Sequence, residues 1–457
     1  MPYNRSGEAT LTVIAILFFV ASMLILTLLG VPLEVSAAVI IGSLIFIISF
    51  INIDLALVIL IFTMLLSPEF KAGEITGRSI KIRADDIFII IIFLGWIAKM
   101  AVNKEMGFMR VTKLNRPIVS YVVICVLVSF LGIVQNRVNI RSSIFYLLKY
   151  TEYFLIYFMV SNNLKTVAQA KKFIFYLLLT CSIVCIYAMA GGGSVEGRIS
   201  APFESGAGGE PNTFAGYLII MMSLMLGLIF NAAPGKKRFI LMGLLFISAV
   251  TFLYTLSRSG WISFFVSLAA FTVFNKKHRI LLIAALLLVI TILPIVAPAS
   301  VHKRVNETFA PWRTYKVMGS RIGLDESAST RIDSWRVGFK RWAKRPILGY
   351  GIPAGVTIDN QYTRVLNETG IVGFIAFIAI LFSVFRLSHG LYLYSQGDDF
   401  AQALSIGFLS GFMGLLLFSG AAATFIIIRI MEPFWFLVAI ISVYPELEKE
   451  EPGADII

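Results

Sequence analysis

Long apolar runs recur along nearly the whole chain, and this feature most constrains how it can fold. In a bilayer every backbone polar group must be hydrogen-bonded within the protein, so an apolar run of about 20 residues crosses as a helix. The candidate spans are 11–29, 35–52, 54–67, 87–102, 117–134, 143–161, 173–190, 213–231, 238–256, 260–274, 280–297, 365–386, 401–419 and 423–444. The sequence therefore predicts an all-α polytopic membrane protein with about 12 to 14 transmembrane helices.

Composition supports one integral membrane domain over residues 1–457. The chain is 58% apolar and 14% charged, whereas a soluble domain carries about 25% charged residues. The longest stretch without an apolar run is residues 298–362, a loop too short for a separate soluble domain. The chain has only three cysteines and three histidines, and no cluster of them has the spacing of metal ligands. We therefore expect no metal and no cofactor.

The basic loops indicate which way the chain crosses the membrane. With the N-terminus in the cytoplasm, four short Lys/Arg-rich loops fall on the cytoplasmic side: 103–116, 162–172, 232–238 and 275–279. This is the usual sidedness of positive charge in a membrane protein, whose short basic loops stay in the cytoplasm. Both termini, including the acidic tail 445–457, are then predicted to be cytoplasmic. The net charge of +13 indicates contact with membrane lipid and gives no reason to expect a nucleic acid partner.

The loop 298–362 breaks this sidedness, because it is strongly basic on the predicted outer side. It carries five acidic residues and eleven Lys and Arg: Lys303, Arg304, Arg313, Lys316, Arg321, Arg331, Arg336, Lys340, Arg341, Lys344 and Arg345. Long loops escape the topology rule, so the orientation stands. A net charge of about +6 calls for an anionic partner, either lipid headgroups or an anionic membrane-embedded substrate.

Part of this loop is predicted to form an interfacial helix. In "STRIDSWRVGFKRWAKRP" the apolar residues recur at three- and four-residue steps, Ser329 or Thr330 could cap the start, and Pro346 ends the run. A basic helix with a tryptophan stripe suits the membrane interface. It could lie passively on the bilayer or line a binding site.

Three arginines lie in or beside separate apolar elements on the predicted outer side: Arg198, Arg258 and Arg331. Arg258 stands between two apolar runs, where a guanidinium is costly to hold without a partner. Arg198 lies in the glycine-rich stretch 191–218. A guanidinium keeps its proton and binds phosphate through two parallel hydrogen bonds. Three that converge would make a site for a phosphorylated ligand.

Several short motifs occur in a recognisable order. They are "GRISAPFESGAGGEPNTFAGYL" (197–218), "SRSGW" (257–261), Arg331 with Trp335, "RPILGYG" (345–351) and "DNQYTRVLNETGIVGFIAF" (359–377). This series resembles the bacterial O-antigen ligase and polysaccharide polymerase family. The resemblance is clearest over about residues 195–385, while the N-terminal half is similar only in hydropathy.

The resemblance implies a membrane glycosyltransferase fold of the C class, with its active site on the periplasmic side and no metal. It implies a glycan donor linked to undecaprenyl diphosphate. The acceptor would be lipid A–core in a ligase or another lipid-linked repeat in a polymerase, and a chain-length regulator is a possible partner. Periplasmic arginines would bind the diphosphate. We assign this role to Arg198, Arg258 and Arg331, with Arg336 as a weaker candidate, because departing diphosphate needs compensating positive charge.

One position departs from the pattern of the ligases. Where the family's ligases usually have a histidine, this chain has Asp359. A carboxylate can act as the general base that takes a proton from the acceptor hydroxyl, but it cannot act as a cation. The departure favours a polymerase over a ligase. Asp359 could instead cap the next helix, and Glu204 and Glu210 are alternative bases.

Other polar residues in the spans are interpreted as structural. Glu368 is expected to be buried structure, and Gly370 and Gly373 to be packing positions. The pairs Arg429 with Glu432 and Lys149 with Glu152 are three residues apart, so each pair could neutralise itself on one helix face. The main alternative from another class is a flippase for lipid-linked oligosaccharide, although the chain shows no repeat with matching halves.

Overall fold

The computed structural model describes residues 33–75, 78–102, 109–192, 194–195, 197–202, 210–232, 234–308, 312–317, 320–355 and 358–450. Its helices are α2 (Leu33–Ile51), α3 (Ile53–Leu66), α4 (Ala84–Val102), α5 (Asn115–Val134), α6 (Ile140–Asn163), α7 (Val167–Tyr187), α8 (Pro211–Asn231), α9 (Gly235–Tyr254), α10 (Arg258–Phe274), α11 (Arg279–Val296), α12 (Ala299–Glu307), α13 (Glu326–Trp342), α14 (Gln361–Tyr394), α15 (Asp399–Phe418) and α16 (Ile428–Glu450). Two short helical turns, Ala188–Gly192 and Thr424–Ile426, complete them.

The prediction of an all-α polytopic membrane protein is confirmed. Every candidate span from 35–52 onward coincides with a helix, and the span 11–29 lies outside the described residues. Among the described helices, 7 are long and apolar enough to cross a membrane, and 4 shorter helices are also apolar. The last helix runs on to Glu450, so residues 445–450 continue α16 rather than form the start of a loose tail.

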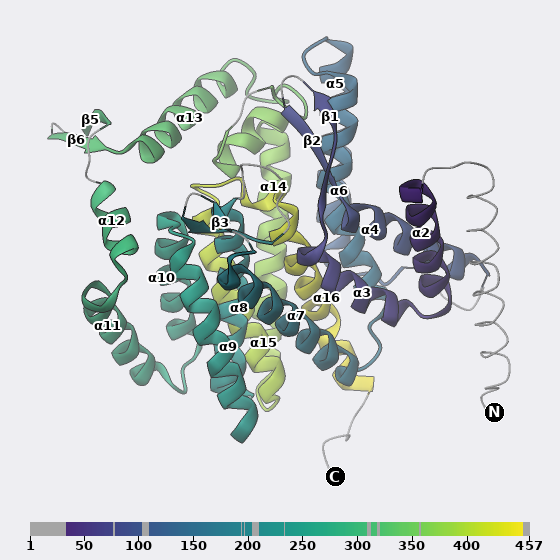
Figure 1. Ribbon diagram of the computed structural model, residues 1–457. Coiled ribbons are helices and arrows are strands. Elements are labelled where there is room, and N and C mark those ends of the chain that lie inside the picture. The colour runs from purple at the N-terminus through teal and green to yellow at the C-terminus, as the bar shows by residue number, and fades with distance from the viewer. Residues whose placement is uncertain are drawn as a thin grey trace.

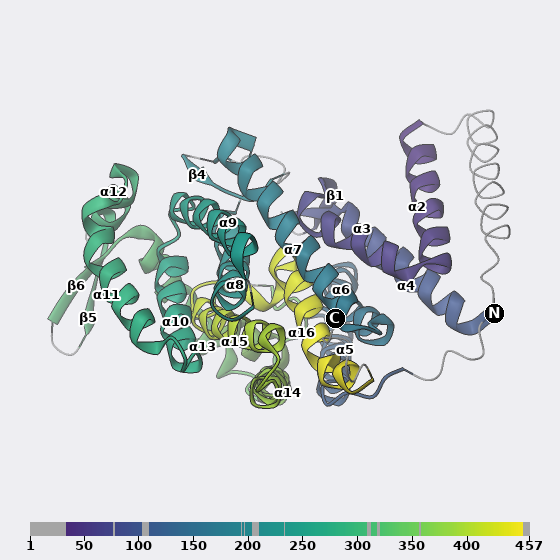
Figure 2. The ribbon, with the colours of Figure 1, turned by 90° about the horizontal axis from the view of Figure 1, so that it is seen from below.

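The bundle has a buried centre and a lipid-facing rim. Among the described long apolar helices, α8 is the most enclosed, and it packs against α15. Gly227 of α8 allows the two backbones to approach closely, because a side chain at this position would overlap the carbonyl oxygen of Ala403. Seen from below, α11 and α12 lie at one edge and α2 at the other (Figure 2). The outer helices α5, α9 and α11 expose many apolar side chains, as lipid contact requires.

One end of the bundle carries most of the non-spanning structure. Helix α13 lies across this end, and a hairpin of β5 (Arg313–Val317) and β6 (Ser320–Leu324) projects beyond it (Figure 1). A second hairpin, β1 (Glu69–Ile75) with β2 (Arg78–Arg83), connects α3 to α4 and contacts α4. A third joins β3 (Ser194–Val195) and β4 (Arg198–Ile199). The sequence analysis did not predict these hairpins, because two-stranded ribbons bury too little apolar surface to leave a clear pattern.

The predicted helix of the basic loop exists, but it begins earlier than expected. Its N-cap is Asp325, whose carboxylate accepts a hydrogen bond from the backbone N–H of Ala328. Ser329 and Thr330, the predicted caps, lie inside the helix. Aspartate at an N-cap is as good an acceptor as serine, and the early start adds a turn that brings Asp325 to the outer site described below.

Helix α14 is broken at Gly370, which has φ 65° and ψ −165°. A side chain at this glycine would overlap the backbone of Ile347 and Leu348.

We predict that Gly370→Ala destabilises the fold by about 1–3 kcal/mol or more, since the backbone conformation itself is strained for alanine. Thermal unfolding of the purified protein in detergent measures this. Gly390→Ala in the same helix is the control, because that site is open; equal melting temperatures of the two variants would contradict the prediction.

The prediction that two charged pairs neutralise themselves on one helix face is right for Lys149 with Glu152 and wrong for Arg429 with Glu432. Lys149 lies 3.6 Å from Glu152, as predicted, and also forms an ion pair with Asp86. Arg429 instead lies 3.7 Å from Glu69, and Glu432 lies 4.0 Å from Arg83. The start of α16 packs beside the β1–β2 hairpin, so cross-element partners replace the local pair.

Candidate functional site

The turn between α9 and α10 positions Arg258. Ser257 caps α10, accepting from the N–H of Gly260, and its hydroxyl donates to Asn212 Oδ1 at 2.7 Å. This makes Arg258 the first residue of α10, at the end of the bundle that carries α13. Its guanidinium donates to Thr308 Oγ1 at 2.7 Å and to Asp325 Oδ2 at 2.5 Å. The partners that make a guanidinium tolerable at the start of this span are therefore a threonine and an aspartate from the loop 298–362.

Arg198 lies beside the same turn. It comes from β4 and is partly buried, and its Nε donates to the backbone oxygen of Thr255 at 3.0 Å. Thr255 is only three residues before Arg258. Two arginines that are 60 residues apart in the chain thus meet at one turn.

Arg331 completes the group from the other side. It lies on α13, six residues after the Asp325 cap. Burial lowers the pKa of Arg331, the carboxylates of Asp359 and Asp325 oppose this shift, and the positive charges of Arg258 and Arg304 add to it. Each of these interactions requires the groups to be near one another. The structure therefore brings together the three arginines that the sequence analysis singled out, although their role as phosphate ligands stays a prediction.

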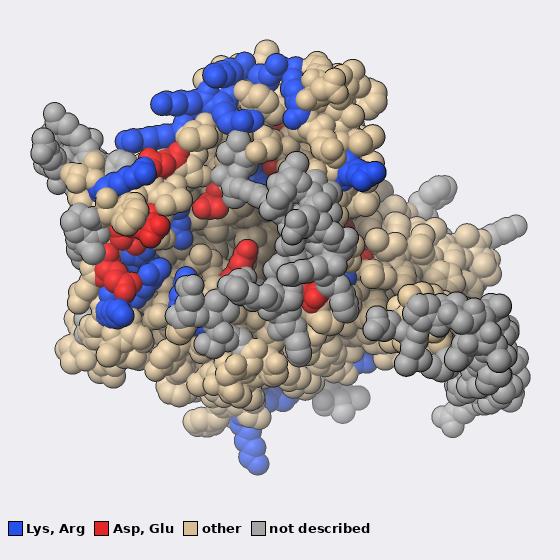
Figure 3. All heavy atoms as spheres, turned by 45° about the horizontal axis from the view of Figure 1, so that its top comes forward, with Lys and Arg blue, Asp and Glu red and all other residues tan. Residues whose placement is uncertain are grey.

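Two members of the cluster were not predicted as site residues. Arg304 on α12 lies 2.9 Å from Glu307, and Asp325 holds Arg258. Arg304 was counted only as one of eleven basic residues, and no motif marks it. Asp325 could have been found, because aspartate before "ESA" is a typical helix start. Figure 3 shows Lys and Arg gathered over α13 and again over α12, on the face that carries this cluster.

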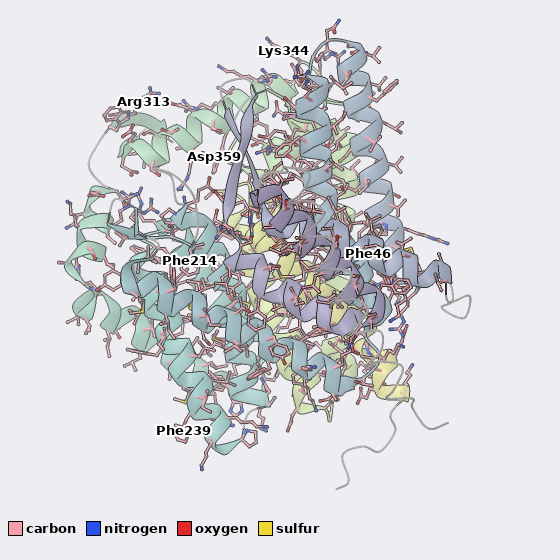
Figure 4. All side chains as sticks on the ribbon, turned by 45° about the vertical axis from the view of Figure 1, so that its right-hand side comes forward. Phe46, Phe214, Phe239, Arg313, Lys344 and Asp359 are labelled. Carbon is pink, nitrogen blue, oxygen red and sulfur yellow. The ribbon has the colours of Figure 1, made fainter. Side chains whose placement is uncertain are left out.

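Asp359 lies at the inner side of α13. It is exposed and close enough to Arg331 to stabilise that positive charge. Figure 4 shows it between α13 and the bundle, at the level where the β1–β2 hairpin passes. The cap of α14 is Asn360, whose Oδ1 accepts from the N–H of Thr363 at 2.9 Å. The alternative in which Asp359 is only a helix cap is therefore wrong.

The other candidate bases and the fourth arginine are placed differently. Glu210 is the residue before α8, where its carboxylate accepts from Thr213 Oγ1 at 2.9 Å. Glu204 lies outside the described residues. Arg336 is exposed on α13, about 140° around the helix axis from Arg331. The structure does not bring Arg336 to the face that Arg331 uses, because five residues are not a whole number of helical turns.

Glu368 is buried, as predicted. It accepts from Arg364 Nε at 3.0 Å and from the Tyr150 hydroxyl at 3.0 and 3.2 Å. This network joins α14 to α6. A carboxylate with these partners is committed to holding two helices together.

An apolar groove starts beside the arginine cluster. It has a volume of about 520 Å³ and is lined by Leu253, Trp261, Phe265, Leu286, Ile290, Ala297, Val301, His302 and Val305. These residues come from α9, α10, α11, α12 and the turn before α12. Trp261 lies one turn after Arg258, and Val301 and Val305 flank Arg304. The groove thus lies between α10 and α12, the helices that carry Arg258 and Arg304, and the lipid-facing helix α11.

The described residues contain no group of three or more His, Cys, Asp or Glu side chains that could hold a metal ion. Arginines can bind and stabilise negative charge, the groove can hold an apolar chain, and Asp359 can accept a proton.

Comparison with known proteins agrees with this geometry. Residues 243–378 match the family model described as O-Antigen ligase. No curated protein matches the chain. The matched segment runs from α9 to the middle of α14, so it contains Arg258, Arg304, Asp325, Arg331 and Asp359 and lines the apolar groove. The chain is therefore similar to the O-antigen ligase family over residues 243–378, and its described helices are those of a multi-pass membrane protein.

Proposed function

We propose that this protein transfers a glycan from an undecaprenyl-diphosphate donor to an acceptor at the periplasmic face of the bacterial inner membrane. The observation that carries this proposal is the meeting of Arg198, Arg258 and Arg331 at the head of an apolar groove. A lipid diphosphate needs both features. The groove takes the isoprenoid chain and the guanidiniums take the diphosphate.

In the proposed reaction the acceptor hydroxyl oxygen attacks the anomeric carbon of the donor glycan. The bond from that carbon to the diphosphate oxygen breaks, and the diphosphate leaves with the electron pair. Asp359 accepts the hydroxyl proton. Positive charge already held in place stabilises the developing negative charge without reorganisation, which is the role proposed for Arg258 and Arg331.

Asp325 is proposed to hold Arg258 in position until the donor binds. The carboxylate and the hydroxyl of Thr308 occupy two donor positions of the guanidinium, which has five N–H groups. The remaining N–H groups are available for phosphate oxygens. The same ion pair joins α10 to the start of α13, so it also fixes the loop over the groove.

We favour a polymerase, which extends a lipid-linked repeat, because a carboxylate stands at Asp359 where the ligases of the family usually have histidine. The ligase reading has its own support in the description of the family model that matches residues 243–378. In that reading the acceptor is lipid A–core.

Reconstitution of the purified protein tests the proposal. In detergent, an enzyme releases free undecaprenyl diphosphate from a lipid-linked glycan when an acceptor is present. A flippase releases none. Product analysis then separates the two enzyme readings, since longer glycan on the carrier identifies a polymerase and glycan on lipid A–core a ligase. Failure to release carrier with either acceptor would contradict the proposed function.

The groove gives a separate prediction. Leu286→Trp fills the groove and is expected to raise the KM for a full-length undecaprenyl donor about tenfold, the equivalent of losing the burial of about two methylene groups. The KM for a donor with a short isoprenoid chain should stay the same. Leu287→Trp is the matched control, because Leu287 is 58% exposed on the rim of α11 and does not line the groove. Equal KM changes in the two variants would remove the groove from the donor site.

A further inference from the structure

A second pocket lies on the same end of the molecule, away from the arginine cluster. It has a volume of about 300 Å³ and is lined by Val128, Leu131, Gln135, Arg137, Arg345, Pro346, Ile347, Leu348 and Gly349. These residues come from the end of α5, the turn before α6, and the segment that follows α13. The pocket combines an apolar floor with two guanidiniums at its edge.

The two arginines lie close to each other and have no acidic partner in the part of the chain that the structure describes. Burial and the positive charge of Arg345 both lower the pKa of Arg137. Arg345 is held with its guanidinium carbon 5.6 Å from the centre of the Tyr350 ring, a favourable contact between a cation and an aromatic face. Two like charges held together in this way are stabilised by an anion that bridges them.

The apolar floor continues onto surface that faces lipid. On the lipid-facing surface, α5 exposes Phe130 and Val134, which are 61% and 62% exposed, and α14 exposes Ile375, which is 63% exposed. The helices α5 and α14 pack against each other. A ligand that fits both parts has a phosphate group above and acyl or isoprenoid chains below.

The pocket is separated from the proposed donor site by the length of α13. Arg331 is near the start of this helix, and Trp342 at its end is roughly 17 Å further along the axis. Arg345 follows three residues later. Figure 4 shows Lys344, its neighbour in the chain, at the top of the view and apart from Asp359. A lipid held at Arg345 would need its glycan to extend back along α13 to reach Asp359.

We propose that Arg137 and Arg345 bind the phosphate group on the lipid anchor of the acceptor, so that two lipid phosphates are held at opposite ends of α13. The inference rests on the proposed function for the identity of the acceptor, but not for the binding itself. The arrangement positions the donor's anomeric carbon and the far end of the acceptor glycan near Asp359. It also requires the acceptor glycan to be long enough to span the distance.

Binding is tested with native mass spectrometry of the full chain in detergent. The probes are undecaprenyl diphosphate and diphosphorylated lipid A as acceptor anchors, and phosphatidylglycerol as a general membrane lipid. Three proteins are compared, and all carry Arg258→Ala to weaken phosphate binding at the proposed donor site. The first has no other change. The second adds Arg137→Gln and Arg345→Gln, and the third adds Arg313→Gln and Lys340→Gln. The last form loses the same charge from the same face, but neither of its residues lines the pocket.

We expect the pocket variant alone to bind at least one acceptor anchor about tenfold more weakly, with unchanged binding of phosphatidylglycerol. An equal loss of phosphatidylglycerol would show a general headgroup site and overturn the acceptor assignment. Unchanged binding of both anchors would overturn the site.

Kinetics separate this inference from the proposed function. With Arg258 intact, the variant with Arg137→Gln and Arg345→Gln should raise the acceptor KM about tenfold and leave the donor KM and kcat within about twofold. A rise in donor KM of the same size would overturn the assignment to the acceptor. If the unaltered protein transfers no glycan, the proposed function fails, while the binding experiment still decides whether the pocket exists as a phosphate site.

Discussion

Replacing Arg258 with alanine is expected to lower the rate of glycan transfer about 10²- to 10³-fold, which is the usual cost of removing one preorganised group that stabilises developing charge. The structure gives the reason. Among the described residues, two side chains of the overlying loop, Thr308 and Asp325, hold Arg258 in place. No other arginine of the cluster has two such partners in this part of the chain. Its loss removes positive charge at the head of the groove and loosens the contact between α10 and the loop. The measurement is release of undecaprenyl diphosphate by purified protein.

Two further variants separate catalysis from folding. Arg258→Lys keeps the charge but loses the planar fork that matches phosphate, so it should recover only part of the rate. Arg313→Ala is the matched control, because Arg313 also forms an ion pair with an aspartate of the same loop, Asp333, but is 59% exposed in its side chain. An exposed ion pair contributes little, so this variant should remain active. Full activity of Arg258→Ala in a stable protein would remove the central assignment.

The second large effect is expected at Asp359. Asp359→Asn keeps the size of the side chain but cannot accept the proton of the acceptor hydroxyl, and general base catalysis contributes about 10²- to 10⁴-fold. We expect kcat to fall within this range with little change in donor binding. Asp359→Glu should retain part of the activity, because it restores the carboxylate in a displaced position.

Asp333→Asn serves as the control for Asp359. It removes an acidic group from the same outer loop, where the carboxylate pairs with Arg313 away from the cluster. If Asp359→Asn retains the activity of this control, the base must be another group, and Glu210 and Glu204 become the residues to test. The Glu210 carboxylate lies at the start of α8, only two residues before Asn212, which accepts from the Ser257 cap beside Arg258.

The positions of the spans could be read from the sequence, because crossing a bilayer is a local requirement. A helix of sufficient apolar length satisfies its own backbone within lipid, so each run from 35–52 to 423–444 was found without knowledge of its neighbours. The interfacial helix could also be predicted from its local pattern of apolar residues. Its first residue could not, because Asp325 and Ser329 are about one helical turn apart and both are good N-cap residues. Four of the five motifs behind the family resemblance lie within the matched segment 243–378, and the stretch 197–218 lies before it.

The partners of the charged residues were decided only by the tertiary structure. Arg258 meets Asp325 across 67 residues, and Arg429 meets Glu69 instead of Glu432 although the latter is three positions away. Hydropathy fixes where a helix lies along the membrane normal, but its rotation about its own axis follows from packing against several neighbours. That rotation determines which guanidiniums share a site. The sequence alone therefore supplied the spans and the candidate arginines. Only the packed bundle determined that Arg198, Arg258 and Arg331 lie together while Arg336 faces elsewhere.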